Sequence, residues 1–276
     1  MPPVTLVGHI APDLDCLTAL WILRRFRHTD AVLAFVPAGQ ILHGNPADSD
    51  PAVIHCDTGG GRYDHHLPGA RVCAAELVRR DIAPDDRALA QMVRVVDAHD
   101  HGTAEREPPV FSISTLISGY NGLYADAPAR VAALMLPNLD AWYAAEQRAQ
   151  RQQAAFADHI AFETPWGRAV ALESQDGIAA RLAYGSGAVL YLFRDGRGHT
   201  GIAARPQSEV DLTEVYAALQ RSEPAADWYL HPNRRLLLCG TDKAPAVHPS
   251  RLPLAEIIAL IETGGWSDTL FAEMDG

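Results

Sequence analysis

The stretch Asp57–His66 reads DTGGGRYDHH and follows a short apolar run, Ala52-Val53-Ile54. A run of this kind is typical of a buried strand, which places Asp57 where the strand ends. The three glycines that follow allow a tight turn that bulky residues would not permit. The stretch closes on Asp64-His65-His66, so metal-binding side chains lie on both sides of one turn. We interpret it as part of a metal site, with a polar surface turn as the alternative.

A second group with the same chemistry, His9-x₃-Asp13-x-Asp15, follows the strand-like run at residues 4–8. Divalent cations bind carboxylate and imidazole ligands, and two carboxylates so close together in a turn can face two different ions. The two groups together therefore predict a binuclear metal site. The alternative treats His9 as an ordinary loop histidine and both aspartates as helix N-caps, a role that aspartate commonly has.

A third group, Val95–Gly102, ends a predicted helix and contains Asp97 and Asp100. Their spacing places these two aspartates on one face of the helix. A carboxylate at a helix C-terminus interacts unfavourably with the helix dipole, so a nearby cation would explain the placement. We expect one of the two to be the remaining carboxylate ligand and leave open which one. The alternative is a solvated helix end.

Strands and helices alternate over the first part of the chain. Strands are expected at 4–8, at 31–36 and just before Asp57, and helices at 14–26, 70–80 and 87–96. This alternation predicts an α/β fold with a parallel sheet and helices on both of its faces. In such sheets the functional site lies beyond the carboxyl ends of the strands, where His9, Asp13 and Asp57 fall. Residues 101–128 contain Pro108-Pro109 and Asn121-Gly122 and are expected to form loops and turns.

The second part of the chain has a different pattern. Residues 129–160 are rich in Ala and Gln without an internal glycine, which predicts one long helix or a broken pair. Short strands are expected after Trp166, at 168–172, 188–193, 200–204 and 236–238, with a final helix at 254–261. We therefore expect a metal-binding catalytic domain over residues 1–125, a helical linker over 126–162, and a smaller α+β domain that binds substrate over 163–276.

The charge of the chain limits the partners it can have. The formal net charge is −11 and the isoelectric point is about 5.5. Proteins that grip long nucleic acids through their phosphates usually carry a basic face, and the sequence contains no basic run of that kind. Bound divalent cations would restore positive charge locally. The balance favours a short or small phosphorylated substrate over a duplex.

The cysteines and the N-terminus indicate the compartment. Cys16, Cys56, Cys73 and Cys239 have scattered spacings without a CxxC pair, so reduced core thiols are expected. The first residues lead directly into a strand-like run without a basic flank, unlike a signal peptide. The apolar runs are shorter than the roughly 20 residues that a membrane span requires. These observations predict a cytoplasmic protein that does not bind membranes.

The order of these motifs resembles the DHH phosphoesterase superfamily, which includes RecJ-type exonucleases, phosphodiesterases of nano-RNA and cyclic dinucleotides, and manganese pyrophosphatases. Within the superfamily, three motifs of this sequence are similar to those of the Myg family of DHH-related exonucleases. These motifs are Asp57-x-Gly59-Gly60 ahead of Arg62–His66, the run Val96–Gly102, and Ser114-Thr115-Leu116 with Asn121 nearby. The resemblance covers about the first 160 residues. The first motif has the plain DHH form, however, and Gly196-Arg197-Gly198-His199 only approximates the GGGH signature of the usual DHH-associated domain.

The resemblance implies two divalent cations, with Mn²⁺ preferred and Mg²⁺ as the alternative. It implies that one cation is held by His9, Asp13 and Asp57, and the other by Asp15, Asp57, His65 and Asp97. It also implies that His66 contacts the phosphate and that Asp64 orients the histidine pair. The expected activity is hydrolysis of phosphodiester bonds in short single-stranded RNA or DNA, or in small phosphodiesters. A pyrophosphatase or nucleotide phosphatase, and a non-catalytic nucleotide-binding module, are the alternatives. The oligomeric state stays open, with a homodimer as one option.

The second domain offers candidate groups for binding such a substrate. Arg205 and His231 are expected to contact phosphate, because arginine presents planar donors that match it. Trp228, with Tyr229 beside it, is expected to stack on a base, as aromatic residues do in single-strand binders. The alternative is that this aromatic pair belongs to the core.

Overall fold

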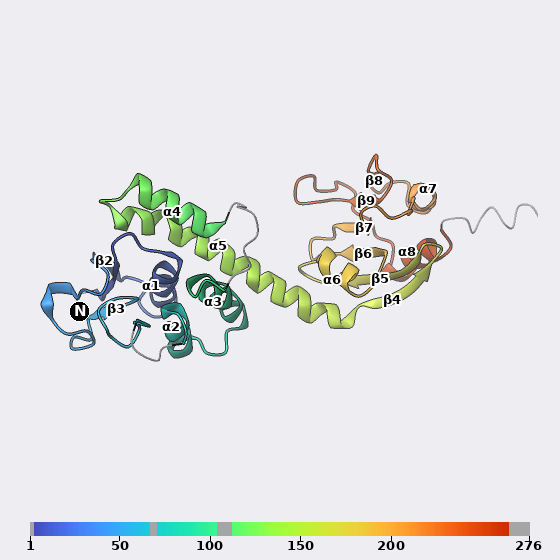
Figure 1. Cartoon of the computed structure of the whole chain (residues 1–276). Coiled ribbons are helices and arrows are strands. Elements are labelled where there is room, and N and C mark those ends of the chain that lie inside the picture. The colour runs from blue at the N-terminus through green and yellow to red at the C-terminus, as the bar shows by residue number, and fades with distance from the viewer. Residues whose placement is uncertain (1–2, 67–70, 104–111, 265–276) are drawn as a thin grey trace, which may run out of the picture. The chain divides into compact units, whose positions relative to one another are not determined.

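A computed structural model of the chain describes residues 3–66, 71–103 and 112–264. The chain divides into two compact units, Met1–Gln147 and Arg148–Gly276, which are described separately. The division falls within helix α5 (Pro128–Ala155), and therefore inside the segment expected as a helical linker. The predicted α/β fold class is confirmed, because both units combine helices with a sheet (Figure 1).

A parallel sheet of three strands forms the centre of the first unit. Its strands are β1 (Thr5–His9), β2 (Val32–Val36) and β3 (Val53–His55), in the spatial order β2-β1-β3. The middle strand β1 pairs in parallel with both neighbours. The carboxyl ends of all three strands therefore meet at one edge, and this brings His9 next to the residues that follow β3.

Three helices of the first unit pack against one another: α1 (Leu14–Phe26), α2 (Ala74–Ile82) and α3 (Arg87–Asp100) (Figure 1). Helix α1 also contacts β1, and its apolar residues Leu17 and Leu20 are fully buried. Asp13 caps this helix by accepting a hydrogen bond from the backbone N–H of Cys16 at 2.9 Å. A 3₁₀ turn, η1 (Leu42–Gly44), lies between β2 and β3.

Part of the segment expected as loop is a helix, α4 (Ile113–Leu123), so the expectation for residues 101–128 is wrong there. Ser112 caps α4 by accepting a hydrogen bond from the N–H of Thr115. Ile117 is buried, and further apolar side chains of α4 pack on the core of the first unit. Tertiary packing of these residues outweighs the helix-breaking tendency of the two glycines within α4. Pro108-Pro109 lies outside the described residues.

Helix α5 is a single helix, which decides between the two forms expected for this region, and it contains Pro137. Its buried residues include Met135, Leu139 and Tyr143. Proline has no backbone N–H to donate, so the helix lacks one hydrogen bond at this position. The 3₁₀ turn η2 (Phe156–Asp158) follows α5 directly.

The second unit contains a mixed sheet of six strands in the order β4-β5-β6-β7-β9-β8. The strands are β4 (Ile160–Thr164), β5 (Gly167–Glu173), β6 (Leu190–Arg194), β7 (Thr200–Ala204), β8 (Trp228–Leu230) and β9 (Leu236–Cys239). Among the described strands of this sheet, only the β5–β6 pair is parallel. The helices are α6 (Ala180–Gly185), α7 (Thr213–Ser222) and α8 (Leu254–Glu262). The sequence predicted β5, β6, β7, β9 and α8 but missed the other elements. Within the described residues, no helix is both long and apolar enough to cross a membrane.

Candidate metal centre

A pocket of about 450 Å³ lies at the carboxyl edge of the parallel sheet. Its lining includes four carboxylates and three imidazoles, those of Asp13, Asp57, Asp64, Asp100, His9, His65 and His66. Carboxylate oxygens and imidazole nitrogens are the ligands that Mn²⁺, Zn²⁺ and related ions take in proteins. The fold therefore concentrates metal-binding side chains from distant parts of the sequence in one pocket.

Asp57 lies at the centre of this group, and only 2% of its surface is exposed. The Nε2 atom of His9 donates a hydrogen bond to Asp57 Oδ2 at 3.2 Å, while His65 Nε2 lies 3.0 Å from Oδ1. Despite this proximity, Oδ1 is buried without a hydrogen-bond partner among the described residues. Leaving a buried carboxylate oxygen unsatisfied is costly. A cation between Asp57 and His65 would satisfy it, so the donor set fits a metal.

The turn after Asp57 brings the two ends of the stretch Asp57–His66 together. Gly59 and Gly60 have φ values of 83° and 69°, and Asp57 itself has a φ of 59°. A Cβ atom on Gly61 would lie 2.9 Å from Asp48 Oδ2, so a side chain there would collide with its neighbour. The backbone N–H of Asp57 donates to the carbonyl of Tyr63 at 2.9 Å, which closes the turn. Asp57 holds a left-handed conformation that is strained for a residue with a side chain, as is common at functional sites.

Asp64 ties the turn to the histidine pair. Its carboxylate accepts hydrogen bonds from the N–H of Gly60 at 2.7 Å, the N–H of His66 at 3.0 Å and the His66 ring at 2.9 Å. Burial alone would raise the pKa of Asp64, but these donors lower it below its usual range. The His66 side chain is 66% exposed, so Asp64 holds an imidazole at the mouth of the pocket. Burial lowers the pKa of His66, but Asp64 and Asp57 outweigh this effect and raise it.

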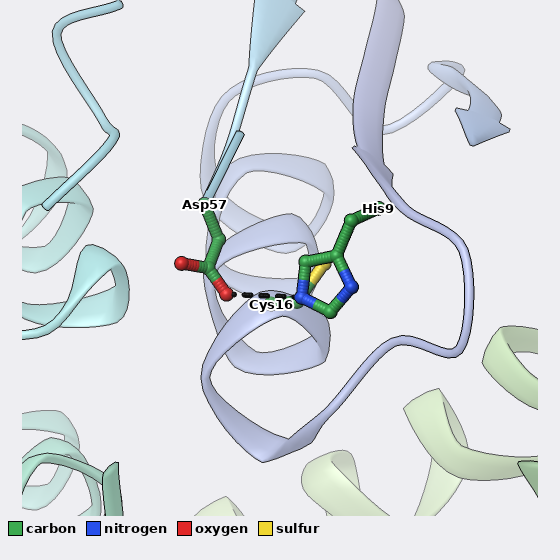
Figure 2. Close-up of side chains that lie close together, drawn as sticks. All are labelled: His9, Cys16 and Asp57. Atoms are coloured by element: carbon green, nitrogen blue, oxygen red, sulfur yellow. Dashed lines mark hydrogen bonds and ion pairs between the residues drawn. The ribbon is translucent and has the colours of Figure 1, made fainter. Parts of the chain in front are cut away.

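The surroundings of His9 change its pKa strongly. Burial lowers its pKa, but Asp57 and Cys16 outweigh this effect and raise the pKa to about 12. Figure 2 shows that the His9 ring and the Asp57 carboxylate face each other, with the sulfur of Cys16 beside them. The second ring nitrogen, Nδ1, lies 2.9 Å from the carbonyl oxygen of Ile10. A cation at Nε2 would replace the proton there, while the contact with Ile10 would fix the tautomer.

Asp15 and Asp97 are placed differently from the other expected ligands. Asp15 accepts hydrogen bonds from the N–H groups of Ala74 and Ala75 at 2.7 and 2.8 Å, and Asp97 accepts one from Cys73 at 2.7 Å. The two carboxylates thus satisfy free donors at the start of α2. Asp15 Oδ2 still lies 3.6 Å from His65 Nε2. Burial and the charge of Asp57 raise the pKa of Asp15 above its usual range.

Asp100 lies in the pocket, with Oδ2 at 3.7 Å from His65 Nδ1. The sequence left open whether Asp97 or Asp100 is the remaining ligand. The structure places Asp100 beside His65 and Asp97 at the start of α2. His101, which the sequence analysis did not single out as a ligand, has its Nδ1 atom 3.6 Å from Asp100 Oδ2. Its place directly after Asp100 at the end of α3 is the sequence signal that identifies it.

Several groups of side chains in the described residues could hold a metal ion. Three are in the first unit: His9, Cys16 and Asp57; Asp57, His65 and His66; and His65, Asp100 and His101. A fourth, formed by Asp195, His199 and Asp242, is in the second unit. From the sequence, Cys16 was expected to be a core thiol, and His199 appeared only in an approximate GGGH signature. Their spacing along the chain carries no metal-binding pattern, so only the fold reveals the groups.

The expected substrate-binding residues belong to the second unit. Trp228 is 4% exposed and packs in the hydrophobic core, so the expectation that it stacks on a base is corrected in favour of the core alternative. The guanidinium group of Arg205 donates to the carbonyls of Tyr184 and Ala188 at 2.9 and 3.0 Å. His231 is half-buried, and its Nδ1 atom accepts a hydrogen bond from the N–H of Asn233.

Comparison with known proteins leaves the family open. No protein-family model and no curated protein matches the sequence. Among solved structures, the chain matches an uncharacterized protein from Helicobacter pylori G27 with 12% identity and a TM-score of 0.29, over 94% of this chain and 98% of the other. A likeness at this level carries no argument about fold or activity, and the chemistry of the site rests on its own geometry.

Proposed function

We propose that the first unit is a metal-dependent phosphoesterase of the DHH type that hydrolyses phosphodiester bonds in short single-stranded nucleic acid. The observation that carries this proposal is the placement of Asp57. Its buried carboxylate has one oxygen beside His9 and the other beside His65, and this second oxygen has no hydrogen-bond partner in the part of the chain that the structure describes. A carboxylate shared between two imidazoles in this way suits a pair of divalent cations.

The residues divide into two cation positions. The first is formed by His9, Asp13 and Asp57, and the second by Asp57, His65 and Asp100, with Asp15 next to His65. Mn²⁺ is the ion we propose, with Mg²⁺ as the alternative, since both accept these oxygen and nitrogen ligands. Such a pair supplies Lewis-acid activation of the phosphate and lowers the pKa of an attacking water.

The remaining polar groups of the pocket suit a phosphate substrate. His66 stands at the mouth with its ring held by Asp64, and its raised pKa favours the protonated form that donates to a phosphate oxygen. Asp64 acts as a positioning residue through these bonds. The net charge of −11 supports a short substrate, because a long polyanion would be repelled beyond the reach of the bound cations.

The test is hydrolysis of four substrates in the presence of Mn²⁺: a linear dinucleotide, a cyclic dinucleotide, a short labelled RNA and pyrophosphate. We expect cleavage of the dinucleotide or the RNA, and loss of that activity in Asp57→Ala with the fold intact by circular dichroism. Asp30→Ala, which changes an exposed aspartate outside the pocket, is the matched control and should retain full activity. Cleavage of pyrophosphate alone would replace the proposal with a pyrophosphatase, and binding without turnover would replace it with a binding module.

A further inference from the structure

We propose that Cys16 is a sulfur ligand at the cation position formed by His9 and Asp57, and that it makes this position select Zn²⁺ over Mg²⁺. The inference rests on the two-cation centre proposed above and concerns its first position. It gives that centre two unlike positions, one with sulfur and one with only oxygen and nitrogen ligands.

The three ligand atoms are close enough to share one ion. One donor atom each from His9, Cys16 and Asp57 lies within 4.8 Å of the other two. Figure 2 shows the three side chains converging from the end of β1, the first turn of α1 and the residue that follows β3 by two positions. Around a tetrahedral zinc, bond lengths of about 2.0 Å to N and O and 2.3 Å to S put neighbouring ligand atoms roughly 3.3–3.6 Å apart. His9 Nε2 and Asp57 Oδ2, at 3.2 Å, are already near this separation.

The fold makes room for the sulfur at this point. Cys16 is fully buried, and a Cβ atom built on Gly8 would lie 2.7 Å from its Sγ atom. Any side chain at position 8 would therefore force Sγ out of place, so this glycine of β1 admits the thiol beside His9. Asp13, which is 56% exposed, accepts the N–H of Cys16 and fixes the first turn of α1. Sulfur thus approaches from the buried side and the Asp13 carboxylate from the solvent side.

A second observation points to a ligand independently of the cysteine. The Asp57 side chain is almost fully buried, and its Oδ1 atom has no hydrogen-bond partner among the described residues. This carboxylate is common to both proposed positions. A cation at the second position supplies the partner that Oδ1 lacks, while Oδ2 faces His9 and stays available to an ion at the first position. The nearby thiol then decides which cation the first position prefers.

The ligand types set the preference. Thiolate binds Zn²⁺ strongly, whereas Mg²⁺ takes hard oxygen ligands and is not held by sulfur. A position with one imidazole, one thiolate and one or two carboxylates therefore suits Zn²⁺ and, among spectroscopic probes, Co²⁺. The second position, with Asp57, His65 and Asp100, has no thiol among its ligands and keeps the preference for Mn²⁺ or Mg²⁺.

The experiment is titration of the full-length, metal-free protein with Co²⁺, followed by absorption spectroscopy. We expect a near-ultraviolet sulfur-to-cobalt charge-transfer band, which Cys16→Ser should abolish. Calorimetry should show Zn²⁺ affinity falling more than tenfold in Cys16→Ser, since losing even an outer partner of a ligand costs about 10–100-fold. Mg²⁺ affinity should stay unchanged. The matched control is Cys56→Ala, which removes another fully buried thiol outside the metal-competent groups of the described residues and should retain the band.

Two results would overturn the inference: Co²⁺ binding without the charge-transfer band, or equal Zn²⁺ affinity in the wild type and in a folded Cys16→Ser variant. The wild-type spectrum decides the matter even where the variant does not fold. Because these readouts need no turnover, the two proposals fail separately. Mn²⁺-supported hydrolysis without the charge-transfer band would refute only the proposal that Cys16 is a ligand. A band without hydrolysis would refute only the proposal that the first unit is a phosphoesterase.

Discussion

Replacement of Asp64 by alanine should loosen the turn that holds the candidate metal centre together. The Asp64 carboxylate is buried and accepts three hydrogen bonds, from the backbone N–H groups of Gly60 and His66 and from the His66 ring. Hydrogen bonds to a charged group contribute roughly 1.5–3 kcal/mol each. Water can reach Gly60 and His66, which are exposed, and replaces part of this loss. We therefore expect the variant to lose about 2–3 kcal/mol of unfolding free energy.

The assay is urea unfolding of the metal-free protein, followed by circular dichroism and tryptophan fluorescence. For a unit of this size, the expected loss corresponds to a fall of about 5–10 °C in the melting temperature. The control is His66→Ala, which removes only the bond from an exposed ring and should cost less than about 1 kcal/mol. Equal stability of the two variants would refute the argument, because the backbone donors would then contribute nothing.

The pH dependence of the same variant provides a further check. The donors around Asp64 hold its pKa below the usual range in the folded protein. A lowered carboxylate pKa stabilises the fold at pH values above the unfolded pKa of about 3.9. That contribution disappears as the pH falls through the lower folded pKa. The stability gap between wild type and Asp64→Ala should therefore be full at neutral pH and shrink only in strong acid, and a gap that widened in acid would contradict this assignment.

Three further predictions follow from the metal centre and the second unit. Because the His9 pKa is raised to about 12 without a cation, Mn²⁺ should bind more tightly as the pH rises and should release a proton, which calorimetry in buffers of different ionisation enthalpy will detect. Asp100→Asn should weaken binding of the second cation, measured by calorimetry. Asp97→Asn should leave the cation affinity unchanged but lower the unfolding free energy by about 0.5–2 kcal/mol, measured by thermal unfolding. Trp228→Ala should destabilise the second unit by about 3–5 kcal/mol in urea unfolding, whereas an exposed, stacking tryptophan would cost little.

The local patterns of the chain predicted much of the fold. The apolar spacing of Leu17 and Leu20 predicted α1, whose bounds match the expectation, and alternation of strands and helices predicted the parallel sheet. Helix α4 was missed because Asn121-Gly122 is also a common turn signal. Local propensity is weak there, and the burial of Ile117 in the core favours the helix instead.

The sequence by itself determined that carboxylates and imidazoles stand at the strand ends around the candidate centre, because strand and helix periods are local properties. Only the tertiary structure shows that Asp100 lies beside His65 while Asp97 accepts an N–H at the start of α2, since these contacts depend on where the first turn of α2 meets α3. It also decided that Trp228 is a core residue and that the thiol of Cys16 lies beside His9. Such contacts join residues far apart in the chain, and their distances follow from packing rather than from spacing along the sequence.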